Sequence, residues 1–388
     1  MIAYNSTWLS NLSVVKESKR WYKDKFLSES EFAAISEAHP SEFYHPNVFI
    51  RILLFLATLV ALAGITGLLG LMFIEAFEDA IELLCLLYGL GSWVFLEMIF
   101  IRKGKHYKSG VTEALLYHSI GWTIGGFAAM VDFNEPLVII ACIFIFGFAA
   151  IRYADLISTA IAFGAFAYLL FYELYQAGGI FTQIIPIAFI VLFTPIYFII
   201  VRLKKKAETE LWDDSLVLLE SATLLIIYAA GNYFVVRELS EQMLNMYVEP
   251  GGDIPFASLF YALTVLIPVA YLYFGWKNKN VILLRVSLVA LAFSVFTFKY
   301  YFSLGHPEIT LTLAGAALLV IALYFFQYLR TPRQGFTREN LLKEKWADAN
   351  PEAFIISQTL GGNKLPSDSP TDLGGGGSFG GGGSSDSY

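Results

Sequence analysis

Long apolar runs separated by short polar segments occupy the chain from residue 48 to residue 329. Each run approaches the roughly twenty residues that a helix rising about 1.5 Å per residue needs to cross about 30 Å of hydrocarbon. The pattern predicts an all-α polytopic integral membrane protein, a helical bundle of about ten transmembrane helices. The predicted spans are residues 48–74, 80–101, 110–131, 136–153, 156–175, 180–202, 213–236, 254–275, 281–302 and 308–329.

Composition supports the membrane assignment. Of the 388 residues, 56% are hydrophobic and only 15% are charged, whereas soluble domains carry about 25% charged residues. The lipid bilayer is therefore the expected partner. A net charge of −7 argues against a general nucleic-acid binder, and Cys85 and Cys142, both inside apolar runs, argue against a disulfide framework or a thiolate metal site.

Basic residues predict the orientation, because positively charged loops stay cytoplasmic. If the N-terminus is cytoplasmic, only Arg237 and Lys299 of the 26 Lys and Arg residues fall on the far side. The segment before residue 48 has no apolar core, so we expect no cleavable leader and a first span that directs insertion. Both termini are predicted to be cytoplasmic.

The segments outside the spans divide into three regions. Residues 1–47 form a predicted cytoplasmic amphipathic segment with two short helices, the first capped by Asn11 and the second opened by a Ser28–Glu31 capping box and ending before Pro40. It either lies on the inner headgroups or docks a protein partner. A short cytoplasmic helix is expected within residues 330–357. The Gly/Ser-rich tail, residues 358–388, is predicted to be disordered.

Two resemblances follow from these segments. Trp21, Phe26-Leu27-Ser28, Glu31 and Ile35, followed by many spans, resemble uncharacterised bacterial predicted-membrane-protein families with a short cytoplasmic helical segment. The glycine run from Gly374 to Ser384, interrupted by Phe379, is similar to the tails of membrane proteins with a TPM domain. The first resemblance implies a bacterial inner membrane, and neither supplies catalytic residues.

Ionisable residues deep in the spans are the default functional candidates, because burying charge in lipid is costly. Glu113 and His118 in the third span, Glu220 in the seventh and Arg285 in the ninth share one depth on the cytoplasmic side. Where these helices meet, Arg285 would neutralise Glu113 or Glu220. The competing interpretation for Glu97, Glu113 and Arg285 is structural ion pairing. For His118 it is an interhelical hydrogen bond. The apolar neighbours of Glu220 require it to be paired or protonated.

Small residues and prolines mark further features. Three glycines in the first span and three in the third allow helices to approach closely. Prolines in the sixth and eighth spans are expected to break those helices and free backbone carbonyls. The glycines are Gly64, Gly67, Gly70, Gly121, Gly125 and Gly126, and the prolines are Pro186, Pro195 and Pro268.

Motifs for metalloproteases, serine hydrolases, intramembrane aspartyl proteases and nucleotide loops do not occur. We therefore expect no enzyme, no catalytic residues, no cofactor and no metal site. Ten spans divide into halves of five, residues 48–175 and 180–329, in which the second half enters the membrane inverted, as in many secondary transporters. Scarce buried charge favours a non-enzymatic scaffold or accessory protein that recruits a cytoplasmic protein through the N-terminal segment or the tail. The alternative is a permease for a small molecule, with a site near the third and seventh spans.

Overall fold

The computed structural model describes residues 2–72, 74–242 and 252–301 and scattered positions from 312 to 331; for residues 74–79 only the backbone is described. Within these residues the fold is helical and contains no strand, only one isolated bridge between Tyr44 and His106. The helices are α1 (Ser6–Lys23), α2 (Glu29–Ala38), α3 (Val48–Met72), α4 (Ile74–Phe95), the π-helical η1 (Leu96–Lys103), α5 (Val111–Met130), α6 (Glu135–Tyr153), α7 (Leu156–Ala177), α8 (Ile180–Leu203), the 3-10 helix η2 (Ala207–Trp212), α9 (Asp213–Gly231), α10 (Tyr233–Gln242), α11 (Ala257–Lys277) and α12 (Val281–Tyr301).

The all-helical prediction is confirmed for the described residues, and the length and composition of the helices support the membrane prediction. In the described part, 8 helices are long and apolar enough to cross a membrane. The third predicted span, α5, is a continuous helix of 20 residues but is less apolar than these, and many of its side chains are buried between its neighbours. The predicted tenth span, 308–329, lies largely outside the described residues, as do the helix and tail predicted after residue 331.

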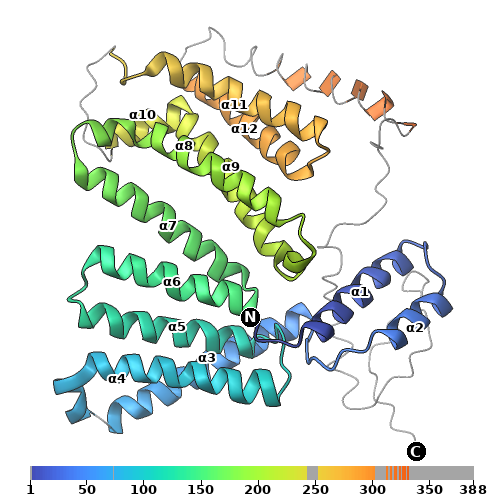
Figure 1. Cartoon of the computed structure of the whole chain (residues 1–388), viewed down its shortest axis with the longest axis vertical. Coiled ribbons are helices and arrows are strands. Elements are labelled where there is room, and N and C mark those ends of the chain that lie inside the picture. The colour runs from blue at the N-terminus through green and yellow to red at the C-terminus, as the bar shows by residue number, and fades with distance from the viewer. Residues whose placement is uncertain are drawn as a thin grey trace, which may run out of the picture. The chain divides into compact units, whose positions relative to one another are not determined.

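Helices adjacent in sequence pack as pairs: α4 with α5, α6 with α7, α8 with α9 and α11 with α12. The pairs are joined through α5–α6, α7–α8, α7–α9 and α9–α12, so α6 and α7 lie between α5 and α9 (Figure 1). The prediction of two helices rather than one across 136–175 is confirmed. Ala154 at the break has a left-handed backbone, with φ +49°, and Asp155 caps α7 by accepting a hydrogen bond from the Ser158 N–H at 2.7 Å.

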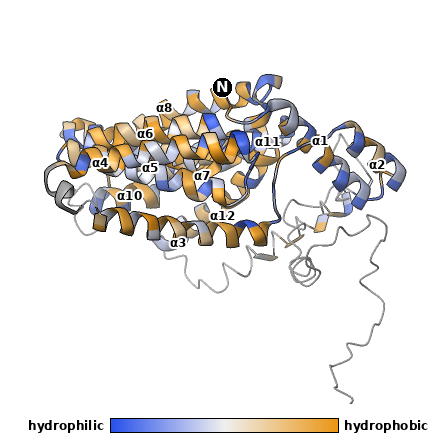
Figure 2. Cartoon of the chain, turned by 90° about the horizontal axis from the view of Figure 1, so that it is seen from below, coloured by the Kyte–Doolittle hydropathy of each residue, from blue (hydrophilic) through white to orange (hydrophobic). Residues whose placement is uncertain are grey.

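Hydrophobic residues predominate along these helices (Figure 2), and many large apolar side chains on them are exposed. Val60, Leu71 and Phe144 are 73%, 75% and 72% exposed. Such a large exposed apolar surface is unfavourable in water and favourable in contact with lipid hydrocarbon. The outer faces of the helices are thus suited to lipid.

The N-terminal segment forms the two predicted helices, with one correction. The capping box at Ser28 and Glu31 is confirmed, and α2 ends at Ala38, before Pro40. The first helix starts earlier than predicted, because Asn5 rather than Asn11 accepts the hydrogen bond from the Trp8 N–H. Asn11 instead donates from Nδ2 to the Pro40 carbonyl at 2.8 Å, which ties α1 to the end of α2.

Two of the backbone predictions within the spans are wrong in part. α8 and α11 continue through their prolines, whereas the predicted seventh span is broken at Asn232, between α9 and α10. Of the six glycines, only Gly126 lies against a neighbouring helix; a Cβ on any of the other five would meet nothing within 4 Å. A Cβ on Gly126 would lie 2.5 Å from the Leu86 nitrogen, so α4 and α5 touch through backbone there.

Gly126→Val is expected to destabilise the protein because the added side chain must push α4 away from α5. Overpacking of this kind costs about 1–3 kcal/mol. Gly125→Val introduces the same side chain at the preceding position, which faces open space, and should leave the thermal midpoint in detergent nearly unchanged. Equal midpoints for the two variants would contradict the α4–α5 contact.

Candidate functional site

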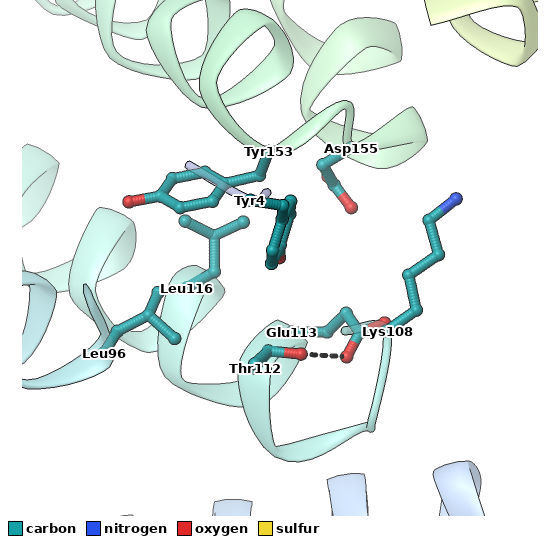
Figure 3. Close-up of a pocket in the computed structure, with 8 residues that line it drawn as sticks. All are labelled: Tyr4, Leu96, Lys108, Thr112, Glu113, Leu116, Tyr153 and Asp155. Atoms are coloured by element: carbon teal, nitrogen blue, oxygen red, sulfur yellow. Dashed lines mark hydrogen bonds between the residues drawn. The ribbon is translucent and has the colours of Figure 1, made fainter. Parts of the chain in front are cut away.

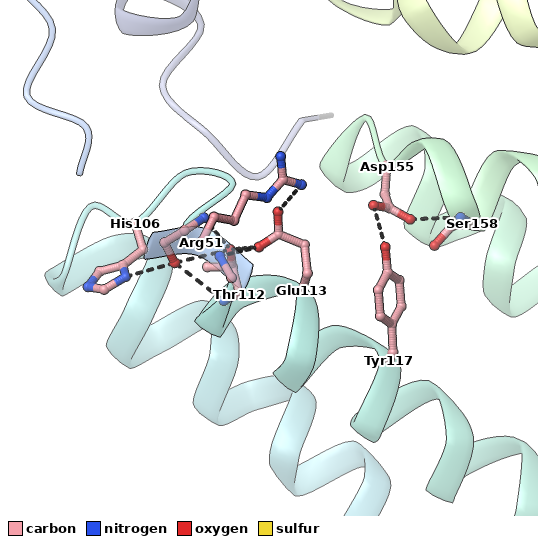
Figure 4. A network of polar contacts seen from close by, with 9 residues as sticks. Arg51, His106, Thr112, Glu113, Tyr117, Asp155 and Ser158 are labelled. Carbon is pink, nitrogen blue, oxygen red and sulfur yellow. Dashed lines mark hydrogen bonds and ion pairs between the residues drawn. The ribbon is translucent and has the colours of Figure 1, made fainter. Parts of the chain in front are cut away.

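Glu113 lies at the start of α5 and is 8% exposed. Its Oε2 accepts hydrogen bonds from the Gly110 N–H at 2.7 Å and from the Thr112 hydroxyl at 2.9 Å, and its Oε1 lies 2.5 Å from Arg51 on α3 (Figure 4). Gly110 has φ +89°, and a Cβ there would lie 2.0 Å from the Arg51 carbonyl oxygen. The carboxylate therefore caps α5 and joins it to α3.

A small cavity lies beside Glu113 and is lined in part by the N-terminal segment (Figure 3). Its volume is about 10 Å³, close to the smallest space that holds one water molecule. Tyr4 lines it and is 8% exposed, and the Ala3 N–H donates to the Arg152 carbonyl at 2.7 Å. Burial, followed by the nearby Glu113 charge, raises the pKa of Tyr4 well above its usual value. The cavity has no room for a substrate.

A second ion pair lies at the C-terminal end of α6. Arg152 donates to both oxygens of Glu97, each at 2.9 Å, and the Tyr153 hydroxyl donates to the same carboxylate at 2.8 Å. The Trp93 indole N–H donates to the Tyr153 oxygen at 2.5 Å. Bidentate pairing of this type fixes both side chains, so Glu97 links η1 to α6.

Asp155, at the break between α6 and α7, forms a further link to α5. It accepts hydrogen bonds from the Tyr117 hydroxyl at 2.9 Å and from the Ser158 N–H at 2.7 Å (Figure 4). The same carboxylate thus caps α7 and holds α5 against it.

Glu220, in α9, is 1% exposed. Its oxygens accept hydrogen bonds from Lys204 Nζ at 2.8 Å and from Asn280 Nδ2 at 2.7 Å. Asn280 Oδ1 in turn accepts from the Ile282 and Leu283 N–H groups at the start of α12. The prediction that this carboxylate is paired or protonated is confirmed by the ion pair, which joins α8, α9 and the start of α12.

His118 lies on α5 among aromatic side chains. Its Nε2 is 3.1 Å from the Tyr88 hydroxyl, which is 2.9 Å from Thr66 Oγ1. The histidine ring packs edge-on against Tyr88 and Trp122. This contact links α5 to α4 and α3, as expected of an interhelical hydrogen bond.

The four candidate residues are distributed over two regions. Glu113 and His118 belong to α5 and have separate partners, while Glu220 and Arg285 belong to α9 and α12, which pack together. The cations in the ion pairs of Glu113 and Glu220 are Arg51 and Lys204. Among the described residues, no group of three or more His, Cys, Asp or Glu side chains is placed to hold a metal ion.

A buried polar network surrounds the break between α9 and α10. Asn232 is 0% exposed; its Nδ2 donates to the Tyr228 hydroxyl at 2.9 Å and to Thr297 Oγ1 at 3.0 Å, and its Oδ1 accepts from the Val235 N–H at 3.3 Å. The Tyr233 N–H, freed by the break, donates to Thr264 Oγ1 at 2.9 Å. Thr264 of α11 and the Asn232 side chain thus accept hydrogen bonds from backbone N–H groups that the break frees, and Thr297 of α12 contacts the Asn232 amide.

Several of these residues have no distinctive sequence signal. Arg51, Arg152 and Lys204 read as ordinary cytoplasmic charges next to span ends, and their partners are distant in sequence. Asp155 and Asn280 could have been found, because each directly precedes a helix and is of a residue type that caps helices. Comparison with protein-family models, curated proteins and solved structures finds no match to this chain.

Proposed function

We propose that this chain is a non-enzymatic scaffold or accessory protein of a bacterial inner membrane, with ten spans and both termini on the cytoplasmic side. It recruits a cytoplasmic protein through its N-terminal segment. The observation that carries the proposal is the pairing of carboxylates between helices: Glu97, Glu113 and Glu220 each have a cation from a neighbouring segment. Charges used to join helices are not free to bind a transported ion or substrate.

The N-terminal helices support a docking role. Tyr4 and Phe43, which flank the two helices, are buried against residues of η1, α5 and α6, and the bridge between Tyr44 and His106 fixes the segment between α2 and α3. Trp21 near the end of α1 and Phe26 in the connection to α2 remain 42% and 59% exposed. Exposed aromatic side chains on a fixed element outside the bilayer favour contact with a protein partner.

Replacement of both Trp21 and Phe26 by Ser should reduce recovery of the partner about tenfold or more, because such anchors dominate binding energy. The measurement is chemical cross-linking in native membranes followed by mass spectrometry of proteins that co-purify with the full chain. Phe133→Ser, at an aromatic residue that is 73% exposed in the turn after α5, is the control. The same proteins recovered in equal amounts from both variants would contradict a docking role for these helices.

A secondary transporter is the second candidate, and the break between α9 and α10 favours it, since discontinuous helices form the substrate sites of many carriers. The hydrogen bonds of Asn232 and Tyr233 argue against a transporter, because these polar groups at the break already have partners within the protein. A carrier would fold normally but lose uptake after Glu220→Gln and His118→Ala. A scaffold would keep its partner in both variants.

A further inference from the structure

A groove separate from the charged clusters lies where α3, α4 and α5 meet. It has a volume of about 290 Å³. Leu69 on α3 and Leu84, Cys85 and Leu87 on α4 form its walls, and the Trp122 ring on α5 also lines it. None of these side chains takes part in the ion pairs that join the helices.

Two hydroxyl groups also line the groove, but both are occupied by neighbours. Thr66 donates to the Leu62 carbonyl at 2.8 Å, so at its 2.9 Å contact with Tyr88 it can only accept. Tyr88 therefore donates to Thr66 and must accept at its 3.1 Å contact with His118 Nε2. Each hydroxyl donates its single proton to a neighbour within this chain of hydrogen bonds. The wall therefore has no hydroxyl donor for a ligand and suits hydrocarbon.

The groove adjoins surface that is suited to lipid. Leu68 and Leu71 on α3 are 60% and 75% exposed, and Leu83 and Leu87 on α4 are 49% and 54% exposed. A dry apolar cavity of about 150 Å³ is enough to bind benzene, and this groove has nearly twice that volume. A chain of several methylene groups therefore fits and can enter directly from the bilayer.

We propose that the groove between α3 and α4 is a lipid-binding site that holds one alkyl chain of a bilayer phospholipid. The chain fills the space against Leu69, Cys85 and Trp122, where α3 and α4 make few contacts with each other and both pack on α5. The bound chain acts as packing material between the two helices. This inference does not depend on the scaffold proposal.

The test uses the full chain in nanodiscs of phosphatidylglycerol and phosphatidylethanolamine, with a small fraction of phosphatidylethanolamine carrying a diazirine in one acyl chain. After illumination, peptide mass spectrometry locates the cross-links. Cys85→Trp fills the groove, and Leu83→Trp places the same ring on the outward face of α4, where Leu83 is 49% exposed. Leu69→Phe fills the groove from α3 and serves if Cys85→Trp does not fold.

The expected result is cross-linking concentrated on Leu69, Leu84 and Cys85, reduced at least fivefold at the remaining groove positions by Cys85→Trp or Leu69→Phe and unchanged by Leu83→Trp. Labelling spread evenly over the exposed residues of α3 and α4 would show ordinary boundary lipid and overturn the proposal. Labelling of the groove that persists in both filled variants would also overturn it.

Discussion

Asn232→Leu is expected to lower the unfolding free energy by about 2–4 kcal/mol. The substitution removes three hydrogen bonds from a side chain that is 0% exposed: Nδ2 donates to the Tyr228 and Thr297 hydroxyls, and Oδ1 accepts from the Val235 N–H. Each such bond within a membrane protein contributes about 0.6 kcal/mol on average and up to about 1.7 kcal/mol, and the Val235 N–H is left without its cap. The measurement is SDS-induced unfolding in mixed micelles.

Two further variants test whether the bonds act as a network. Thr297→Val removes the bond that Asn232 Nδ2 donates to Thr297, so its effect should overlap with that of Asn232→Leu rather than add to it in the double variant. Thr194→Val, which removes only a bond to the Ile190 carbonyl within α8, should have little effect. Full additivity of the first two substitutions would refute the network.

Lys204→Met should destabilise the protein by about 3 kcal/mol or more. The substitution leaves Glu220, 1% exposed, with the Asn280 hydrogen bond but without the lysine of its ion pair, and removing one partner of a buried ion pair costs about 3–5 kcal/mol. Lys205→Met is the control, because this neighbouring lysine is exposed. Thermal unfolding in detergent reports both changes.

The double variant Lys204→Met with Glu220→Leu should recover most of the lost stability, because the uncompensated charge is removed together with its partner. If Lys204→Met unfolds like Lys205→Met, the pair does not stabilise the fold. If the double variant is no more stable than the single one, the loss arises from a feature other than the unpaired carboxylate.

The sequence predicted most of the helices because their hydrophobic length is a local property. The two helices on either side of Arg152–Asp155 and the capping box at Ser28 and Glu31 were also predicted, since both depend on neighbouring residues. The helix break was assigned to prolines rather than to Asn232. That break is stabilised by Thr264 and Thr297, which lie on other helices, so the sequence around Asn232 contains no signal of them.

The candidate site was predictable only in its residue types. Glu113 and Glu220 stand out as carboxylates in apolar surroundings, and the need for a cation follows from burial. Which cation is chosen depends on which helices meet: Arg51 reaches Glu113 because α3 touches the start of α5 at Gly110. Of the six glycines in the first and third spans, only Gly126 makes a close approach, since glycine content alone does not tell which face meets a neighbour.

The central claim is that the buried charges join neighbouring helices in separate clusters and do not form one transport site. Disulfide cross-linking in native membranes tests it, in a background with Cys85→Ser and Cys142→Ser. The pair Thr159→Cys and Ser215→Cys, whose native oxygens lie 3.1 Å apart between α7 and α9, should cross-link. The pair His118→Cys and Glu220→Cys, on α5 and α9 with α6 and α7 between them, should not. Efficient cross-linking of the second pair would place both residues in one cavity and contradict the account.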